Sequence, residues 1–312
     1  MDFGKSMEAS SKIRVAAVFA TMNRSHVAHA CVRALIEQAC APDLVVVADN
    51  DSSDDTVHLL NDLTDLPFEL VVLSLPENVG NAGGVDAAME CAFQRGIDAV
   101  WILDDDSFPT AGALRALLVD GYDPHVVRHS MQIDPATERY TWPLQIDSGD
   151  GFRLVHAPAE LGELRFVKTR IMWTGALVSR HVYDAIGRVQ ADLFIRGEDE
   201  EYPLRMENCG FSQEGVVDSV LEHVGPQNLL KVRFLGKNLF YEAGLSDWKL
   251  YYKVRNMVWL QQRARGKLRA AMMALAYGFI GVKVDGWQRL PLLCEAICDG
   301  WSGRLGKWER HP

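Results

Sequence analysis

The sequence predicts an α/β fold in which a doubly wound, mostly parallel sheet is followed by a C-terminal helical extension. Three observations lead to this prediction. Over the first hundred residues, apolar runs typical of buried strands alternate with amphipathic segments of helical period. Each intervening segment has about the length that a crossover between parallel strands requires. From Trp248 onward the chain has the pattern of helices.

The expected elements follow one another in a regular order. We expect strands at 13–20, 44–48, 68–75 and 99–103, and helices at 25–39, 54–63 and 83–95. Between residues 121 and 166 four prolines break the pattern into short pieces, which predicts loops and leaves room for an antiparallel addition. Periodicity returns with strands at 174–179 and 214–222, and with helices at 181–186 and 199–209.

Charge divides the chain into two expected regions, a sheet domain over 1–245 and a basic helical region over 246–312. The formal net charge is −10, which argues against a nucleic-acid partner. Residues 249–312 hold twelve Lys and Arg against four Asp and Glu, so the excess of acid lies in the first part. The basic tail also carries apolar residues, which fits contact with an anionic membrane surface. Packing on the sheet domain or on another subunit is the alternative.

No stretch reaches the roughly 18 to 20 uninterrupted apolar residues of a bilayer-spanning helix, and residues 1–11 are too polar for a signal peptide. The six cysteines show neither a C-x-x-C pair nor zinc-finger spacing, which predicts reduced, structural thiols. The expected location is therefore cytoplasmic, with a peripheral position on the inner face of the cell membrane as an option. The sequence does not determine the oligomeric state.

The sharpest chemical feature is Asp104-Asp105-Asp106, which directly follows the apolar run 100–103. Three adjacent carboxylates at the end of a buried strand repel one another and lose hydration, so they favour a compensating cation. Hard oxygen ligands suit Mn²⁺ or Mg²⁺, and such an ion can hold two phosphates. A solvated turn that caps a helix near Thr110 is the alternative. No role for Asp105 follows from the sequence.

Two other phosphate-handling classes place aspartates after a strand. A Walker-type ATPase needs G-x-x-x-x-G-K-[ST], but Gly4-Lys5-Ser6 has three residues before it and no strand. Phosphatases of the haloacid dehalogenase type resemble D-x-D-x-[TV], whereas the fifth position here is Phe108. Both classes are disfavoured, and another metal-dependent phosphohydrolase remains a minor alternative.

A second acidic cluster, Glu198-Asp199-Glu200-Glu201, follows Gly197. Acidic residues favour a helix N-terminus because they oppose the macrodipole, so a plain helix start is one interpretation. In the other interpretation one carboxylate is a general base for an acceptor hydroxyl.

Three further sites carry polar groups at strand or helix ends. His223 ends an apolar strand, where a neutral imidazole could complete the coordination sphere of the aspartates. Asp49 closes the second strand too early to cap the next helix and is placed to bind a base or ribose. The glycine-rich segment 78–84 precedes a helix, where backbone N–H groups could approach a phosphate or simply start the helix.

Together these motifs resemble the inverting glycosyltransferase family 2, with its GT-A-like nucleotide-sugar fold. The resemblance covers most of the chain and is carried by residues 47–54, 77–84, 104–106, 198–199 and Tyr251-Tyr252-x-x-Arg255-Asn256. Within that family, the segment 194–201 and the later His223 look like the galactofuranosyltransferases of actinobacterial cell-wall assembly, and more loosely like rhamnosyltransferases. The resemblance makes 1–245 a nucleotide-sugar-binding and catalytic domain.

The resemblance also implies a role for individual residues. Asp104 and Asp106 would bind the donor diphosphate through Mn²⁺ or Mg²⁺, with His223 as a further metal ligand and Asp199 as the catalytic base. The remaining expected roles are Asp49 and Arg24 at the uracil end of the donor, Asn78 and Gly84 along the donor pocket, and Trp173 and Glu198 at the acceptor.

The implied reaction is a single in-line displacement that inverts the anomeric carbon. The favoured donor is a UDP-sugar, with UDP-galactofuranose as the best guess. The acceptor would be a hydroxyl of a lipid-linked or polysaccharide glycan in cell-envelope synthesis. A rhamnosyltransferase that uses a TDP-sugar and a non-catalytic nucleotide-sugar-binding protein are the alternatives.

Overall fold

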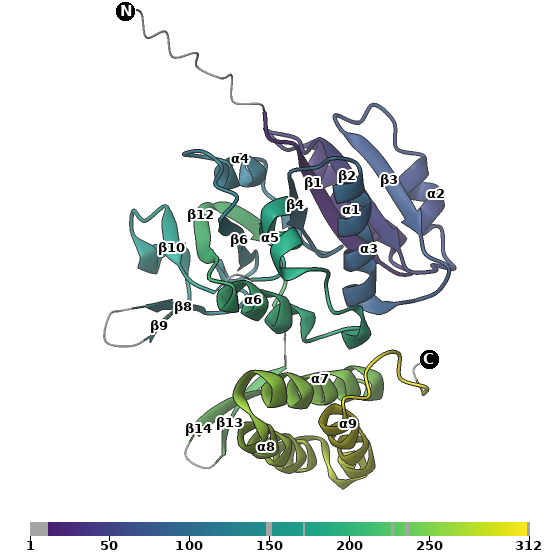
Figure 1. Ribbon diagram of the computed structural model, residues 1–312, viewed down its shortest axis with the longest axis vertical. Helices are drawn as coiled ribbons and strands as arrows, with labels where there is room; N and C mark the ends of the chain where they lie inside the picture. The colour runs from purple at the N-terminus through teal and green to yellow at the C-terminus, as the bar shows by residue number, and fades with distance from the viewer. Residues whose placement is uncertain (1–11, 148–151, 171, 226–227, 235–236, 311–312) are drawn as a thin grey trace, which may run out of the picture.

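The computed structural model describes residues 12–147, 152–170, 172–225, 228–234 and 237–310. The expectations for residues 1–11, including Gly4-Lys5-Ser6, lie outside the described residues. The centre of the fold is one large sheet with the strand order β10-β12-β6-β11-β4-β1-β2-β3. Figure 1 shows this sheet above a separate layer of C-terminal helices.

The first half of the sheet is parallel, as the sequence predicts. It consists of β1 (Val15–Thr21), β2 (Leu44–Asp49), β3 (Glu69–Ser74) and β4 (Ala99–Ile102), in which β1 pairs with β2 and β4, and β2 with β3. Every residue of β1, β2 and β4 is buried. Parallel strands covered on both faces are apolar throughout, which explains the unbroken apolar runs.

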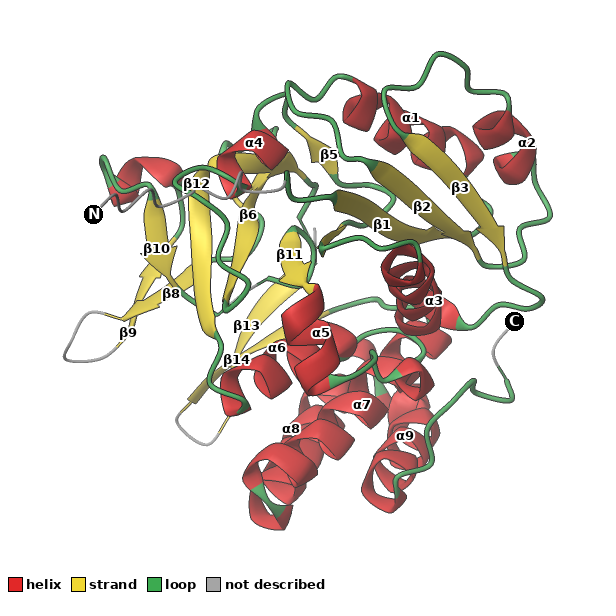
Figure 2. Cartoon of the chain, turned by 45° about the horizontal axis from the view of Figure 1, so that its top comes forward, coloured by secondary structure: helices red, strands yellow, loops and turns green. Residues whose placement is uncertain are grey.

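Helices cover both faces of this sheet. On one face lie α1 (Ser25–Ile36), α2 (Thr56–Asn61) and α4 (Ala113–Leu117). On the other lie α3 (Gly80–Gln94), α5 (Arg180–Ile186) and α6 (Glu198–Asn208), and Trp259 and Leu260 from the C-terminal region join the same core. Figure 2 shows α3, α5 and α6 on the same side of the sheet as the C-terminal helices.

The second half of the sheet is mixed. β11 (Ala176–Ser179) runs antiparallel to both β4 and β6 (Val126–Asp134), and β12 (Ser212–Glu222) runs parallel to β6. The short strands β5 (Phe108–Pro109) and β10 (Phe166–Lys168) pair with β12, and β7 (Arg139–Tyr140) pairs with β6. β8 (Leu144–Asp147) and β9 (Phe152–Val155) form a separate antiparallel pair, followed by the 3₁₀ turn Pro158–Leu161.

The strand β6 corrects the expectation of loops over residues 121–166, whereas the antiparallel addition for which the sequence leaves room is present in the pairs β6–β7, β8–β9 and β10–β12. It is nine residues long and lies between β11 and β12. Its polar residues hide the strand pattern in the sequence, but their partners lie inside the fold. Arg128 donates to the carbonyls of Leu117 and Val119, and Gln132 donates to the carbonyl of Thr174. Because these bonds satisfy the polar groups, a polar strand can lie in the interior.

The C-terminal region is helical, as expected, with α7 (Asp247–Arg265), α8 (Lys267–Asp285), a 3₁₀ turn (Trp287–Arg289) and α9 (Leu290–Ser302). A hairpin of β13 (Leu229–Phe234) and β14 (Lys237–Glu242) precedes these helices and was not expected. Tyr241 and Leu245 share a hydrophobic cluster with the helices, so the domain boundary at residue 245 stays a prediction. Within the described ranges, none of the helices combines the length and apolarity needed to cross a bilayer.

Candidate functional site

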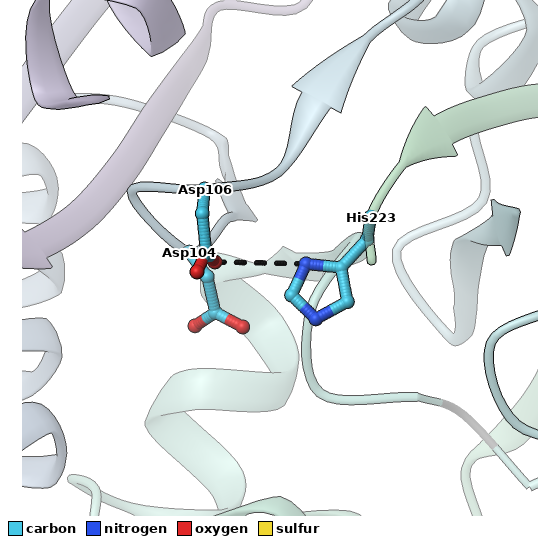
Figure 3. Close-up of side chains that lie close together, drawn as sticks. All are labelled: Asp104, Asp106 and His223. Atoms are coloured by element: carbon cyan, nitrogen blue, oxygen red, sulfur yellow. Dashed lines mark ion pairs between the residues drawn. The ribbon is translucent and has the colours of Figure 1, made fainter. Parts of the chain in front are cut away.

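The carboxyl end of β4 brings together a group suited to a metal ion. One ligand atom from each of Asp104, Asp106 and His223 lies within 4.8 Å of the others (Figure 3). The pairing of β5 with the end of β12 explains the contact, because it places His223 beside the loop that follows β4. His223 Nδ1 lies 3.6 Å from Asp106 Oδ1. Two carboxylates and an imidazole fit a divalent cation such as Mn²⁺ or Mg²⁺.

Asp104 is also fixed from the opposite strand. Its Oδ2 accepts a hydrogen bond of 2.6 Å from the Thr174 hydroxyl, just before β11. Burial raises the pKa of Asp104, and the Thr174 hydrogen bond opposes that shift. A bound cation would favour the ionised carboxylate in the same way, because opposite charge stabilises it.

Asp105, for which the sequence offers no role, has different partners. It accepts hydrogen bonds from Thr21 Oγ1 at 2.8 Å and from Arg24 Nη1 at 2.6 Å. Burial raises the pKa of Asp105 to about 6, although Arg24 acts in the opposite direction. Arg24 Nη2 also lies 3.0 Å from Asp106 Oδ2. Asp105 therefore anchors Arg24 at the aspartate cluster.

Asp49 lies at the end of β2, as the sequence predicts, and is 2 % exposed. Its Oδ2 accepts from the backbone N–H of Ser52 at 3.2 Å. Its Oδ1 is buried and has no hydrogen-bond partner among the described residues. A buried carboxylate oxygen without a donor is unfavourable, so Asp49 is a candidate for binding a ligand N–H or O–H.

The segment 78–84 starts a helix. Asn78 Oδ1 accepts from the backbone N–H of Gly80 at 2.9 Å, at the beginning of α3. Gly84 is buried, and a Cβ there would lie 2.6 Å from Ala20 Cβ and 2.8 Å from Asn50 Nδ2. Gly84 thus allows α3 to approach the sheet closely, and its expected position along a donor pocket stays a prediction.

The acidic pair at the start of α6 has two distinct environments. Glu198 is buried, and its Oε1 accepts from Asn81 Nδ2 at 3.0 Å. Burial and then the neighbouring Asp199 charge raise the pKa of Glu198 to about 8. Asp199 is exposed, and its Oδ1 accepts from the backbone N–H of Gly197 at 2.9 Å. At neutral pH Glu198 is therefore a protonated group next to an accessible carboxylate.

A cavity of about 520 Å³ connects Asp104 and His223 with the acidic pair at the start of α6. Five of the expected residues line it, namely Asp104, Trp173, Glu198, Asp199 and His223. Two buried polar atoms in this lining, Trp173 Nε1 and Glu198 Oε2, have no hydrogen-bond partner among the described residues. Five other expected residues are not among those that line it: Arg24, Asp49, Asn78, Gly84 and Asp106. Arg24 contacts Asp106, which forms the metal-type cluster together with Asp104 and His223.

Sequence reasoning missed the side of the cavity that comes from the C-terminal region. Glu242 of β14 binds Arg196 at 2.7 Å and Lys253 of α7 at 3.2 Å, and Tyr277 of α8 also lines the cavity. Lys253 lies inside the motif Tyr251 to Asn256, which is the one signal that could have pointed to α7. Nothing in the sequence indicated the hairpin.

The strand order and the helix layers define a GT-A-like fold, which solved structures share. TarS 1-349 from S. aureus in complex with UDP-GlcNAc matches with a TM-score of 0.56 and 14% identity over 92% of this chain and 81% of that one. GalNAc-T7 with UDP, GalNAc and Mn²⁺ matches with a TM-score of 0.55 and 13% identity over 81% of this chain and 48% of that one. Identities this low support the fold alone.

The family follows from the sequence match. The model of glycosyl transferase family 2 matches residues 17–187, which is more than half of the chain. This protein belongs to that family. Galactofuranosyltransferase GlfT1 of Mycolicibacterium smegmatis is 27% identical over 207 residues, which cover 63% of this chain. The match spans 66% of the relative's own length.

Proposed function

We propose that the chain is an inverting, divalent-metal-dependent glycosyltransferase with a nucleotide-sugar donor. One observation carries the proposal: Asp104 and His223 of the metal-type cluster line the same cavity as Asp199. A single displacement requires stabilisation of the leaving group and removal of a proton from the acceptor. The metal-type cluster could serve the first and Asp199 the second.

In the proposed mechanism Asp104, Asp106 and His223 would hold Mn²⁺ or Mg²⁺, and this ion would supply positive charge for the departing diphosphate. Arg24, held by Asp105 and Asp106, is proposed to add a cation at the same place, instead of at the uracil end of the donor where the resemblance puts it. Asp199 accepts the proton of the acceptor hydroxyl, which makes that oxygen nucleophilic. Because one displacement occurs without a covalent intermediate, the anomeric configuration inverts.

The donor is proposed to be a UDP-sugar, with UDP-galactofuranose first. The unpaired Asp49 Oδ1 can accept an N–H of a pyrimidine base, and the name of the relative in M. smegmatis supports galactofuranose. Asn78, at the start of α3, is proposed to contact the same ligand. A TDP-sugar and rhamnosyl transfer remain the second candidate, because Asp49 would pair equally well with thymine.

The acceptor is proposed to be a glycan or glycolipid hydroxyl of the cell envelope. Trp173 offers an indole N–H and Glu198 a carboxyl oxygen, both buried and both without a described partner. Sugar hydroxyls donate and accept hydrogen bonds, so they satisfy both atoms at once.

Peripheral contact with the inner face of the cell membrane, from the cytoplasm, is part of this proposal. α8 carries exposed apolar side chains at spacings of three and four residues, which form one stripe: Leu268, Met272, Leu275 and Phe279. The opposite face of α8 is buried, at Ala270, Ala274 and Ile280. In the sequence, Arg263 and Arg265 at the end of α7 and Lys267 and Arg269 at the start of α8 stand close to the beginning of the stripe, and their charge suits anionic lipid.

The membrane contact is tested with the double variant Leu268→Ser and Leu275→Ser on vesicles that contain anionic lipid. Binding to vesicles should fall while transfer to a water-soluble acceptor stays at the level of the parent protein. Equal vesicle binding of variant and parent would contradict the contact.

The function is tested by a screen of UDP- and TDP-sugars, each with and without Mn²⁺, in which binding and transfer are measured separately. Metal-dependent transfer with inversion supports the proposal. Donor binding without turnover on any acceptor would favour a non-catalytic binding protein, and phosphate release without acceptor would favour a phosphohydrolase.

A further inference from the structure

The motif Tyr251 to Asn256 has no role in the mechanism above, yet its last two residues are among the most buried polar residues of the chain. Arg255 is 1 % exposed and Asn256 is fully buried. Both lie in α7 and face the segment 192–197, which leads directly into the acidic start of α6.

Asn256 binds this segment through its side-chain amide. Its Nδ2 donates to the carbonyl oxygens of Leu193 at 2.9 Å and Ile195 at 3.1 Å, and also to that of Arg196. Its Oδ1 accepts from Arg255 Nε at 2.8 Å, which fixes the orientation of the amide. Asn256 is therefore a bridge between α7 and successive carbonyls of the segment.

Arg255 extends the same contact. Its Nη2 donates to the carbonyls of Asp192 at 3.3 Å and Leu193 at 3.0 Å, and its Nη1 donates to Gly306 at 2.6 Å. The Phe194 ring stacks on Tyr252 with a centroid distance of 4.9 Å. The two residues and this stack hold most of the segment against α7.

The segment needs such support because its backbone is unusual. Phe194 and Arg196 have φ values of 65° and 66°, which non-glycine residues rarely adopt, and Gly197 has a φ of 111°. Conformations of this kind are unfavourable by themselves and persist where surrounding contacts fix them. A Cβ at Gly197 would lie 3.0 Å from Asn256 Cβ, so the segment also lies very close to α7.

The other side of the segment rests on α3. The backbone N–H of Ala82 donates to the carbonyl of Phe194 at 3.0 Å, and Asn81 binds Glu198. The segment is thus held between α3 and α7, and Glu198 and Asp199 follow it immediately.

We propose that Arg255 and Asn256 are positioning residues for the acidic pair. By fixing the carbonyls of residues 192, 193, 195 and 196, they set where α6 begins and hence where Glu198 and Asp199 enter the cavity. The C-terminal helical region is in this view part of the catalytic assembly. The inference rests on the proposed function only for the use of Asp199 in transfer.

The kinetic test compares Asn256→Ala with Tyr241→Phe. The control loses a 2.6 Å hydrogen bond from Tyr241 to Asp285 of α8, and no hydrogen bond to the segment, to Arg255 or to Asn256 is lost. Asn256→Ala should lower kcat about 100-fold, the effect of a misplacement of about 1 Å, while UDP binding in the presence of Mn²⁺ is unchanged. Tyr241→Phe should keep the kcat of the parent. A kcat of Asn256→Ala equal to that of Tyr241→Phe would overturn the proposal.

A second measurement needs no known substrate. Amide hydrogen exchange over residues 191–201 should become about tenfold faster in Asn256→Ala and stay unchanged in Tyr241→Phe. Faster exchange without any detectable transfer by the parent would leave the positioning intact and contradict the proposed function instead. Unchanged exchange in this segment would overturn the positioning itself.

Arg255→Lys tests the same contact with a milder change, and it decides the matter if Asn256→Ala does not fold. Lysine keeps the positive charge but has no Nε–H to orient the Asn256 amide, and it cannot make the paired Nη contacts to the carbonyls of Asp192, Leu193 and Gly306. Loss of kcat with normal UDP binding supports the proposal, and a kcat equal to that of the parent refutes it.

Discussion

Replacement of Asp199 by asparagine separates proton removal from the shape of the site. In the structure Asp199 Oδ1 accepts the Gly197 N–H at 2.9 Å, and an asparagine oxygen can accept the same bond. The side chain of Asp199→Asn therefore keeps the start of α6 but loses its basicity. General-base catalysis contributes about 10² to 10⁴ in rate. That factor corresponds to a rise in the activation free energy of about 3 to 5 kcal/mol.

The assay measures transfer from the donor identified in the screen, together with calorimetric titration of UDP and Mn²⁺. We expect kcat to fall by the factor above while the Kd of UDP with Mn²⁺ is unchanged, because the proposed donor contacts are at Asp49 and the aspartate cluster and do not include Asp199. Glu198→Gln is the comparison variant: it changes the neighbouring carboxyl, which is already protonated at neutral pH, and its amide can still hydrogen-bond the acceptor, so its loss of kcat should be much smaller than that of Asp199→Asn. Normal turnover by Asp199→Asn, with a large loss in Glu198→Gln, would refute the assignment of the base.

Three further predictions follow from the same geometry. The folded chain keeps Glu198 protonated up to about pH 8, whereas the unfolded chain releases this proton near a pKa of about 4.3, so Glu198 destabilises the fold progressively between about pH 5 and 8. The Tm of Glu198→Gln minus the Tm of the parent should therefore increase as the pH rises, and a Tm difference that does not change with pH would contradict this. His223→Ala should weaken Mn²⁺ binding in the presence of UDP at least about tenfold, as measured by metal titration, and unchanged affinity would remove His223 from the ligands. Gly84→Ala should lower the free energy of unfolding by about 1–3 kcal/mol in denaturant titrations and leave UDP binding intact, because its Cβ would overlap Ala20 and Asn50. A loss of UDP binding without loss of stability would instead support the predicted place of Gly84 along the donor pocket.

The elements that the sequence predicted well are those whose surroundings are uniform. β1, β2 and β4 are buried throughout, so their apolar runs were sufficient to predict strands. β6 was missed because it has polar side chains that find partners only after folding, such as Arg128 with the carbonyls of the Leu117–Gly121 turn. Local patterns report solvent exposure and contain no information on distant hydrogen-bond partners.

The same contrast holds for the expected ligand-binding residues. The sequence placed Asp49 at the end of its strand, and the structure adds that one of its oxygens is buried without a described partner. It suggested a ligand contact for Gly84, whereas the structure gives this glycine a packing role. A glycine in a helix start has the same sequence signature in both cases, and only its neighbours distinguish them.

The aspartates after β4 show what the sequence determined by itself. Three adjacent carboxylates after a buried strand implied a cation, because that chemistry is local to residues 104–106. The division of labour among them required the tertiary structure. Asp104 and Asp106 meet His223 because β5 pairs with β12, and Asp105 instead binds Arg24 and Thr21. Partners that lie over eighty residues away in the chain are fixed by sheet order and by burial, which no local pattern contains.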